Sequence, residues 1–209
     1  MTGVTIYMEG GGDSTQDRIH LRQGMDAFMA LLKNRVRKKR WGWNLVACGG
    51  RREAYETFQN ARRRRGSGDI IILLVDSEGP VAAPTRVQHL SMPQGDRWDL
   101  HGVAENEIQL MIQTMEAWIV ADPEALAKYY GQGFRTNALP QHANLESASK
   151  LDVANGLEQA TRNTKKGRYQ KIKHSSTLLQ RVDPRKARAR CPACERMFNE
   201  IGGLIGGLP

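Results

Sequence analysis

Hydrophobic residues in the first half of the chain form short runs that alternate with longer amphipathic stretches. The runs at residues 4–8, 43–48 and 69–76 are largely apolar and end at glycines or acidic residues, which is typical of buried strands in a parallel sheet. Between them, residues 14–39 and 53–64 carry apolar side chains at largely helical spacing. This alternation predicts a parallel α/β sheet with right-handed crossovers, and the most apolar run, 69–76, is expected at its centre.

The pattern changes after the third predicted strand. Residues 77–102 are rich in Pro, Gly, Gln and His, and we expect a long loop of the kind that often carries functional residues. Residues 108–114 are apolar enough for a fourth strand. Pro123 follows Asp122, so a helix is predicted to begin there with Asp122 as its cap.

The last part of the chain, residues 131–209, is more polar and more basic. Helical patterns occur near 149–162 and near 174–181, and the glycine-rich tail "GGLIGGLP" is expected to fray. We therefore predict an open, mainly parallel four-stranded α/β core in residues 1–130. Residues 131–209 are expected to form a basic helical extension packed on that core.

Length and cysteine content limit the class of protein. A chain of 209 residues that is 40% hydrophobic can bury a core of its own. It has no apolar run of about 18 residues and no signal-like N-terminus, so a cytoplasmic protein is expected. Its three cysteines are too few for a disulfide framework. The "CPAC" motif has the spacing of half a zinc site, but no second pair follows it, so structural zinc within one chain is not expected.

The charge of the chain predicts a polyanionic partner. It has 31 Lys and Arg residues against 22 Asp and Glu residues, a formal net charge of +9, and such an excess often accompanies nucleic-acid binding. The positive charges cluster at residues 35–40, 62–65, 161–174 and 184–190. One such run is compatible with a solvated helix face, but four together favour contacts with phosphates. We expect DNA or RNA as the partner.

Carboxylates follow two of the predicted strands. Glu9 comes after the first strand in "EGGGDST", and Asp76 and Glu78 end the third. The glycines are not followed by the lysine of a Walker loop and do not have dinucleotide-fingerprint spacing, so a phosphate cradle is poorly supported. Because parallel strands end at the same edge, we expect the three carboxylates to converge and to repel one another unless a cation neutralises them. Oxygen ligands of this kind suit Mg²⁺ or Mn²⁺, which can promote phosphodiester cleavage.

The arrangement of one Glu after the first strand and an acidic pair after the third resembles the Toprim fold of topoisomerases, primases and related nucleases. More closely, the chain is similar along nearly its whole length to the domain of unknown function family numbered 4276, which is regarded as Toprim-like and is often encoded near phage-defence genes. The segments that carry this resemblance are "YMEGGGDS", "VACGGRREAYETF", "LLVDSEGP", "QLMIQTMEAWIVADPEAL", "GQGFRTNALP" and "ATRNTKKGRYQKIKHSSTLLQRVDP".

The resemblance implies roles for individual residues. It implies that Glu9 is a metal ligand or a general acid or base, and that Asp76 and Glu78 hold a divalent metal. The acidic pair is Asp-Ser-Glu here, whereas the wider Toprim pattern is Asp-x-Asp, so the geometry for two metals is in question. Glu116 is a candidate further ligand. The basic element that some Toprim nucleases direct at transition-state charge is matched by three candidates: Lys171, Lys173 and His174.

Other basic residues are candidates for phosphate binding. Arg51 and Arg52 follow a glycine pair at the same sheet edge, where a helix N-terminus can bind phosphate. Lys165, Lys166 and Arg168 belong to the basic run 161–174. Asp13, in contrast, is expected to cap the first helix.

These observations support three functional hypotheses. The first is a Toprim-type nuclease that uses Mg²⁺ or Mn²⁺ to cleave DNA or RNA in bacterial defence against phage. The second is a non-catalytic Toprim-like module that binds nucleic acid or a partner ATPase. The third is an enzyme that acts on nucleotides or other small phosphoesters at the same site.

Overall fold

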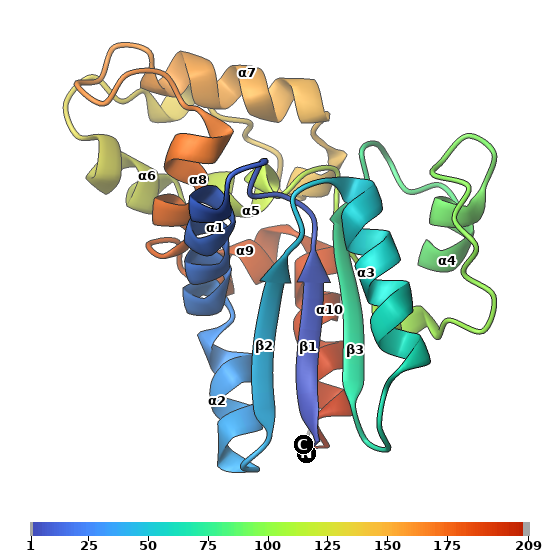
Figure 1. The fold of residues 1–209 in the computed structure, drawn as a ribbon. Coiled ribbons are helices and arrows are strands. Elements are labelled where there is room, and N and C mark those ends of the chain that lie inside the picture. The colour runs from blue at the N-terminus through green and yellow to red at the C-terminus, as the bar shows by residue number, and fades with distance from the viewer. Residues whose placement is uncertain (1, 207–209) are drawn as a thin grey trace.

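The sheet has four parallel strands, as predicted. The computed structural model describes residues 2–206 (Figure 1). The strands lie in the order β2-β1-β3-β4, and each neighbouring pair is parallel. Their bounds are β1 Gly3–Met8, β2 Gly42–Ala47, β3 Ile70–Asp76 and β4 Ile108–Met111. The expected central position of the third strand is confirmed, because β3 lies between β1 and β4.

Helices connect and cover these strands. They are α1 Thr15–Phe28, α2 Ala30–Lys38, α3 Arg51–Arg63, α4 Arg86–Ser91, α5 Glu116–Val120, α6 Pro123–Tyr130, α7 Lys150–Thr161, α8 Lys171–Leu179, α9 Pro184–Arg190 and α10 Pro192–Leu204. Short 3-10 turns occur at Glu105–Glu107, Thr136–Ala138 and Leu145–Ser147.

Two local predictions about the first helix are wrong. The helix expected over residues 14–39 is divided at Met29, whose ψ of 18° leaves the helical range. Its cap is Ser14 rather than Asp13, because the Ser14 hydroxyl accepts a hydrogen bond from the Asp17 N–H at 3.0 Å. The predicted cap of α6 is confirmed, since the Asp122 side chain accepts from the Ala125 N–H.

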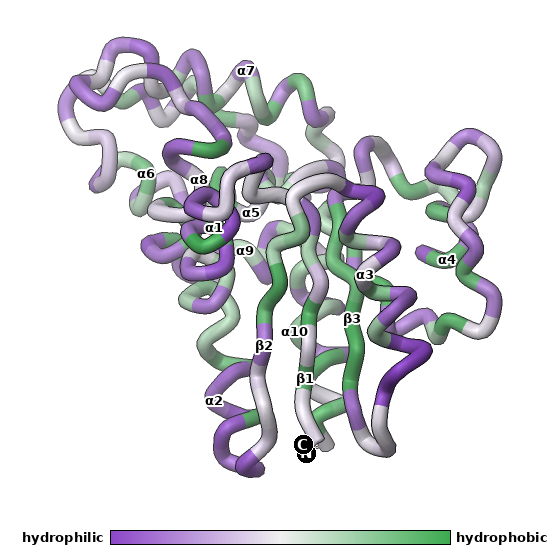
Figure 2. The backbone as a smooth tube through the Cα atoms, in the orientation of Figure 1, coloured by the Kyte–Doolittle hydropathy of each residue, from purple (hydrophilic) through white to green (hydrophobic). Residues whose placement is uncertain are grey.

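Alternate side chains of β3 enter the two hydrophobic layers of the protein. Ile72 and Leu74 belong to the cluster formed with α1, α2 and α10, whereas Leu73 and Val75 join the cluster formed with α3 and α4. Figure 1 shows α3 in front of the strands and α10 behind them, and β3 is the most continuously hydrophobic strand in Figure 2. Burial on both faces explains why this strand is an unbroken apolar run.

The C-terminal half of the chain contributes to the same core. Met197 and Phe198 of α10 belong to one cluster with residues of β1 and α1, so hydrophobic packing crosses the predicted division at residue 130. Helices α5 to α8 lie beyond the carboxyl ends of the strands (Figure 1). The close packing of α8 on α1 requires Gly24, because a Cβ there would lie 2.7 Å from the Ser176 carbonyl oxygen.

Several segments differ from their predictions. The expected loop 77–102 contains α4, and α9 and α10 were not anticipated. Part of the tail expected to fray is the last turn of α10, whereas residues 207–209 lie outside the described residues. Across residues 2–206, every helix is too short or too polar to span a bilayer.

Candidate metal centre

Three carboxylates meet at the carboxyl edge of the sheet. Ligand oxygens of Glu9, Asp76 and Glu78 all lie within 4.8 Å of one another. Among residues 2–206, this is the one group of three or more acidic, His or Cys side chains with such spacing. The convergence expected from the strand order is therefore observed.

The backbone at the ends of the strands sets the positions of these side chains. Glu9 extends β1 by donating its N–H to Leu74 O at 3.1 Å, and Asp76 is the last residue of β3. Glu78 has a φ of 64°, in the left-handed region that is unfavourable for a residue with a side chain. Its N–H donates to Gln113 O at 3.1 Å. With the backbone in this conformation, a Glu78 carboxylate oxygen lies within 4.8 Å of oxygens of the other two.

The glycine run after Glu9 forms a tight turn that borders the site. Gly10 forms an antiparallel bridge with Gly49, with N–H to O distances of 2.8 and 3.0 Å. Gly11 has a φ of 92°, and a Cβ there would lie 2.9 Å from the Arg18 Cα. The glycines therefore allow a close backbone approach. Beside them is a cavity of about 180 Å³ whose lining includes Glu9, Asp76 and the N-terminal residues of α8.

Each of the three carboxylates is already paired with a basic side chain of the protein. Arg51 lies 2.9 Å from Glu9, Lys171 lies 3.2 Å from Asp76, and Lys150 forms an ion pair with Glu78. From the sequence, we expected that a bound cation would be needed to neutralise the three carboxylates. The structure shows that the protein supplies basic groups itself, so the charge repulsion alone does not require a metal.

These three cations differ in how firmly they are held. Arg51 donates through Nε and Nη2 to both carboxylate oxygens of Asp96, each at 2.7 Å, and also to the Asp76 carbonyl oxygen. Its guanidinium lies 5.1 Å from the centre of the Trp98 ring. Lys150 and Glu78, in contrast, are 44% and 45% exposed, so their ion pair is readily exchanged. Of the three carboxylates, Glu78 is therefore the easiest for an incoming ion to reach.

Asp76 is the buried member of the group. Its side chain is 4% exposed, and its Oδ1 accepts a hydrogen bond from the Met115 N–H at 2.8 Å. Burial is the main cause that raises the pKa of Asp76 to about 6; the charges of Glu116 and Glu9 add to it, and Lys171 opposes it. Asp76 is thus a carboxyl group that can gain or lose its proton within the experimentally accessible pH range.

Glu116 lies beside Asp76 but outside the group of three. Its Oε2 accepts from the Thr114 hydroxyl and lies 3.2 Å from Lys171 Nζ, while its Oε1 accepts from the Tyr169 hydroxyl at 3.1 Å. Burial tends to raise the pKa of Glu116, but the Lys171 charge and the Thr114 hydrogen bond outweigh it and hold this pKa below its usual value. The structure thus engages both oxygens of this predicted ligand with protein donors.

The basic candidates on α8 separate clearly in the structure. Lys171 Nζ contacts both Asp76 and Glu116 at 3.2 Å. Lys173 is exposed and belongs to neither ion pair. His174 is buried, and its Nδ1 accepts from the Gln170 N–H at 3.0 Å, an arrangement that stabilises the start of α8. Burial lowers the pKa of His174.

The residues predicted to bind phosphate have varied environments. Arg51 forms ion pairs with Glu9 and Asp96, and Arg52 is an exposed residue that pairs with Glu56. In the segment before α8, Arg168 pairs with Glu158, and Lys166 lies 4.9 Å from the centre of the Tyr129 ring. Lys165 is exposed in the same segment.

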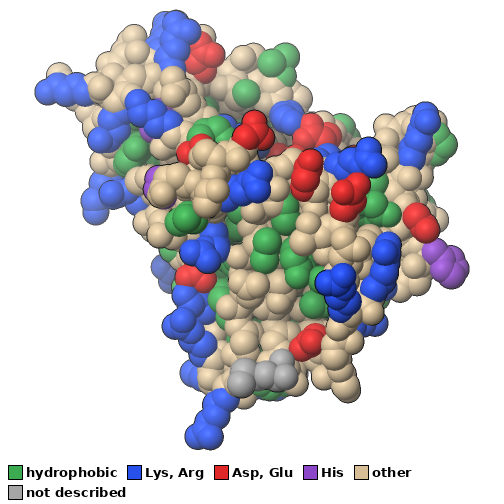
Figure 3. Space-filling view, in the orientation of Figure 1, with side chains coloured by type: hydrophobic (Ala, Val, Ile, Leu, Met, Phe, Trp, Pro, Cys, Tyr) green, Lys and Arg blue, Asp and Glu red, His purple; other side chains and the backbone are tan. Residues whose placement is uncertain are grey.

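The four basic runs are not equivalent. Runs 35–40 and 62–65 include the C-terminal ends of α2 and α3, at the sheet edge opposite the carboxylates. Run 184–190 is largely engaged with acidic neighbours, as in the pairs of Lys186 with Asp122 and of Arg188 with Glu195. Of the four runs, 161–174 is the one with an ion pair to the group of three, between Lys171 and Asp76. Figure 3 shows acidic side chains gathered at the carboxyl end of the sheet and basic ones along the flank that includes α2.

Several residues of the site were not predicted from the sequence. Thr114 and Tyr169 bind Glu116, Lys150 pairs with Glu78, and Asp96 holds Arg51 beside Glu9. Asp96 lies 45 positions from Arg51 along the chain, and Lys150 lies 72 positions from Glu78. Contacts at such separations leave no local pattern, so only the folded chain identifies them.

The donor set fits a hard divalent cation. Mg²⁺ binds oxygen at about 2.0–2.1 Å, so ligands on opposite sides of the ion are about 4.2 Å apart. The 4.8 Å limit on the Glu9, Asp76 and Glu78 oxygens is only slightly larger, and small side-chain rotations can close the difference. The two free cysteines of "CPAC" are buried at the start of α10 and belong to no comparable group among the described residues.

The protein is of the α/β class, with an open parallel sheet and acidic side chains at the carboxyl edge of that sheet. The family model DUF4276, a domain of unknown function, matches residues 8–202. The chain therefore belongs to the DUF4276 family. No curated protein and no solved structure matches the chain.

The pKa of Asp76 predicts how the binding of a divalent ion to the candidate centre would depend on pH. Because this pKa is raised to about 6, the carboxyl group is mostly protonated at pH 5, and an ion must displace its proton. Affinity for Mn²⁺ is expected to fall about tenfold per pH unit below 6 and to level off above about 7. Calorimetric titrations from pH 5 to pH 8 measure this, and a constant affinity over that range contradicts the assignment of Asp76 as a ligand.

Proposed function

We propose that this protein is a Toprim-like phosphodiesterase that uses Mg²⁺ or Mn²⁺ to cleave DNA or RNA. The observation that carries the proposal is the convergence of Glu9, Asp76 and Glu78 at the edge where open α/β sheets bind ligands. The net charge of +9 is consistent with a polyanionic substrate. Under this proposal the biological substrate is phage nucleic acid, in line with the resemblance described above.

The three carboxylates would hold the ion. When bound, such an ion activates water and neutralises charge on a phosphodiester. Arg51 fixes the Glu9 carboxylate, because the guanidinium is itself held by Asp96. The Met115 N–H fixes Asp76 in the same way. The protein thus orients the ligand oxygens before an ion arrives, which reduces the cost of ordering them.

The protein also supplies positive charge next to the proposed ion. The Lys171 ammonium lies at the edge of the carboxylate group and can stabilise charge that develops on a phosphate oxygen. Lys173, in the first turn of the same helix, and Lys165, in the segment before it, are exposed and can contact the backbone of a nucleic acid. Contacts of this kind bind any sequence, so we expect little sequence specificity.

A second function is supported by one observation. Because Arg51, Lys171 and Lys150 already neutralise the carboxylates, a non-catalytic module that binds nucleic acid or a partner ATPase is also compatible with the site. Divalent-dependent cleavage of labelled DNA or RNA, together with its loss on Asp76→Ala, supports the nuclease. Salt-sensitive nucleic-acid binding without hydrolysis in either Mg²⁺ or Mn²⁺ supports the module instead.

A further inference from the structure

The Lys171 ammonium contacts one carboxylate of the proposed centre and one carboxylate beside it. Two-metal phosphodiesterases place their ions about 3.5–4 Å apart, with ligands shared between them. Here Asp76 belongs to the group of three, and Glu116 is a neighbouring carboxylate outside it. The Lys171 Nζ lies 3.2 Å from an oxygen of each.

Protein donors hold the carboxylate oxygens around Lys171 in place. Glu116 Oε1 accepts from Tyr169, and Glu116 Oε2 accepts from Thr114. Thr114 also contacts Asp76 Oδ2 at 3.3 Å. The side chains of Asp76 and Glu116 are 4% and 8% exposed, so neither can rely on water if Lys171 leaves. The Lys171 side chain is itself 43% exposed, but both of its carboxylate partners are buried, so Lys171 is harder to displace than Lys150, whose partner Glu78 is 45% exposed.

The position of Lys171 is also determined by the fold. It is the first residue of α8, which packs tightly against α1 where Gly24 meets Ser176. The hydrogen bond from the Gln170 N–H to His174 stabilises the same helix start. The packing of α8 on α1 thus places the Lys171 ammonium next to Asp76 and Glu116.

We propose that the Lys171 ammonium replaces the second metal ion, so that the centre binds a single divalent ion through Glu9, Asp76 and Glu78. This inference rests on the proposed metal centre and goes beyond it by setting the number of ions. It also implies that Asp76 and Glu116 form a latent second site, with Thr114 as a further oxygen ligand, which opens when the ammonium is removed.

Counting bound Mn²⁺ tests this directly and does not depend on catalysis. Titration of the protein with MnCl₂, followed by the electron paramagnetic resonance signal of free Mn²⁺, gives the number of ions per chain. We expect one ion in the unaltered protein and two in Lys171→Ala. Lys173→Ala, which removes an exposed lysine from the same helix, is the matched control and should bind one. Adding Glu116→Gln to Lys171→Ala should restore the count to one.

The possible outcomes separate this inference from the proposed function. Two ions in the unaltered protein leave the metal centre intact and overturn the role of Lys171, as does a single ion in folded Lys171→Ala. No bound ion in the unaltered protein overturns the metal centre itself and the inference with it. If Lys171→Ala does not fold, Lys171→Met, which keeps a long side chain and removes the charge, takes its place. Two ions in this variant support the inference, and a single ion refutes it.

Discussion

Replacing Asp76 with Asn is expected to reduce divalent-dependent cleavage of DNA or RNA by about 10³-fold, a loss typical of removing charge stabilisation at a catalytic centre. The substitution keeps the size of the side chain and an oxygen that can accept from the Met115 N–H, but it removes the negative charge. Asp76 is the buried ligand in the proposed centre. Its loss should therefore weaken the binding of the ion more than loss of the exposed Glu78 does.

The assay should compare labelled single- and double-stranded DNA and RNA, with Mg²⁺, with Mn²⁺ and with a chelator. Asp13→Asn is the matched control, since Asp13 is an exposed acidic residue of the same glycine turn that lies outside the group of three. It should leave cleavage unchanged. If Asp76→Asn is folded and cleaves at the rate of the unaltered protein, Asp76 is not part of the catalytic centre.

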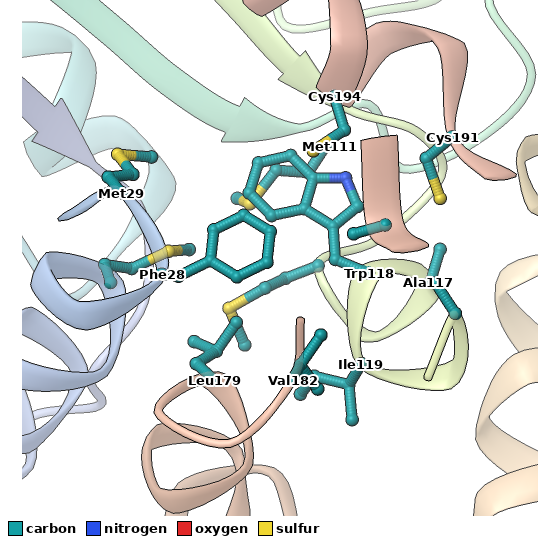
Figure 4. Close-up of a cluster of buried hydrophobic side chains, with 14 of the residues drawn as sticks. Phe28, Met29, Met111, Ala117, Trp118, Ile119, Leu179, Val182, Cys191 and Cys194 are labelled. Atoms are coloured by element: carbon teal, nitrogen blue, oxygen red, sulfur yellow. The ribbon is translucent and has the colours of Figure 1, made fainter. Parts of the chain in front are cut away.

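Replacing Trp118 with Ala is expected to lower the free energy of unfolding by about 3–5 kcal/mol, the usual cost of removing a large aromatic side chain from a core. Trp118 is completely buried and stacks on Phe28, with ring centroids 5.3 Å apart and an interplanar angle of 9°. Figure 4 shows the two rings facing each other, with Leu179 and Val182 nearby. The pair joins α5, which begins at Glu116, to α1 beneath the glycine turn.

Urea unfolding followed by circular dichroism measures this change. Trp118→Phe is the conservative control and should cost much less, because it retains an aromatic ring and removes an indole N–H that is buried without a hydrogen-bond partner in the described structure. Leu151→Ala, at a leucine that is 67% exposed, should have almost no effect. A cost below about 1 kcal/mol for Trp118→Ala would show that this cluster does not stabilise the fold.

The strands could be predicted because their hydrophobic patterns depend on local sequence. The run at 69–76 is apolar because both faces of β3 are covered. The end of β4 was placed too late, because Ile112 continues the apolar run for one residue after the chain leaves the sheet at Met111. The division of the first helix at Met29 could not be predicted, because no glycine or proline lies at or next to this position.

The C-terminal helices were missed for different reasons. Helix α9 lies in a basic run with little apolar periodicity, and its Lys186 is held by Asp122, which lies 64 positions away along the chain. Helix α10, in contrast, has Cys194, Met197, Phe198 and Ile201 at helical spacing. That signal was present in the sequence and could have identified the helix.

The candidate site was predictable only as far as the sheet topology determines it. Strand order alone brings Glu9, Asp76 and Glu78 to one edge. It does not reveal that Arg51 binds Glu9 rather than phosphate, or that Lys171 lies between Asp76 and Glu116. These ion pairs join segments 42 to 95 positions apart, and they depend on how α3 and α8 pack.

The central claim is that these carboxylates bind one divalent ion. Crystals soaked in MnCl₂ and measured at an energy where manganese scatters anomalously locate such an ion without any assay of activity. We predict a single anomalous peak about 2 Å from oxygens of Glu9, Asp76 and Glu78, with Lys171 still in contact with Glu116. Electron density that shows the three carboxylates paired only with Arg51, Lys171 and Lys150, and no anomalous peak between them, would contradict the claim.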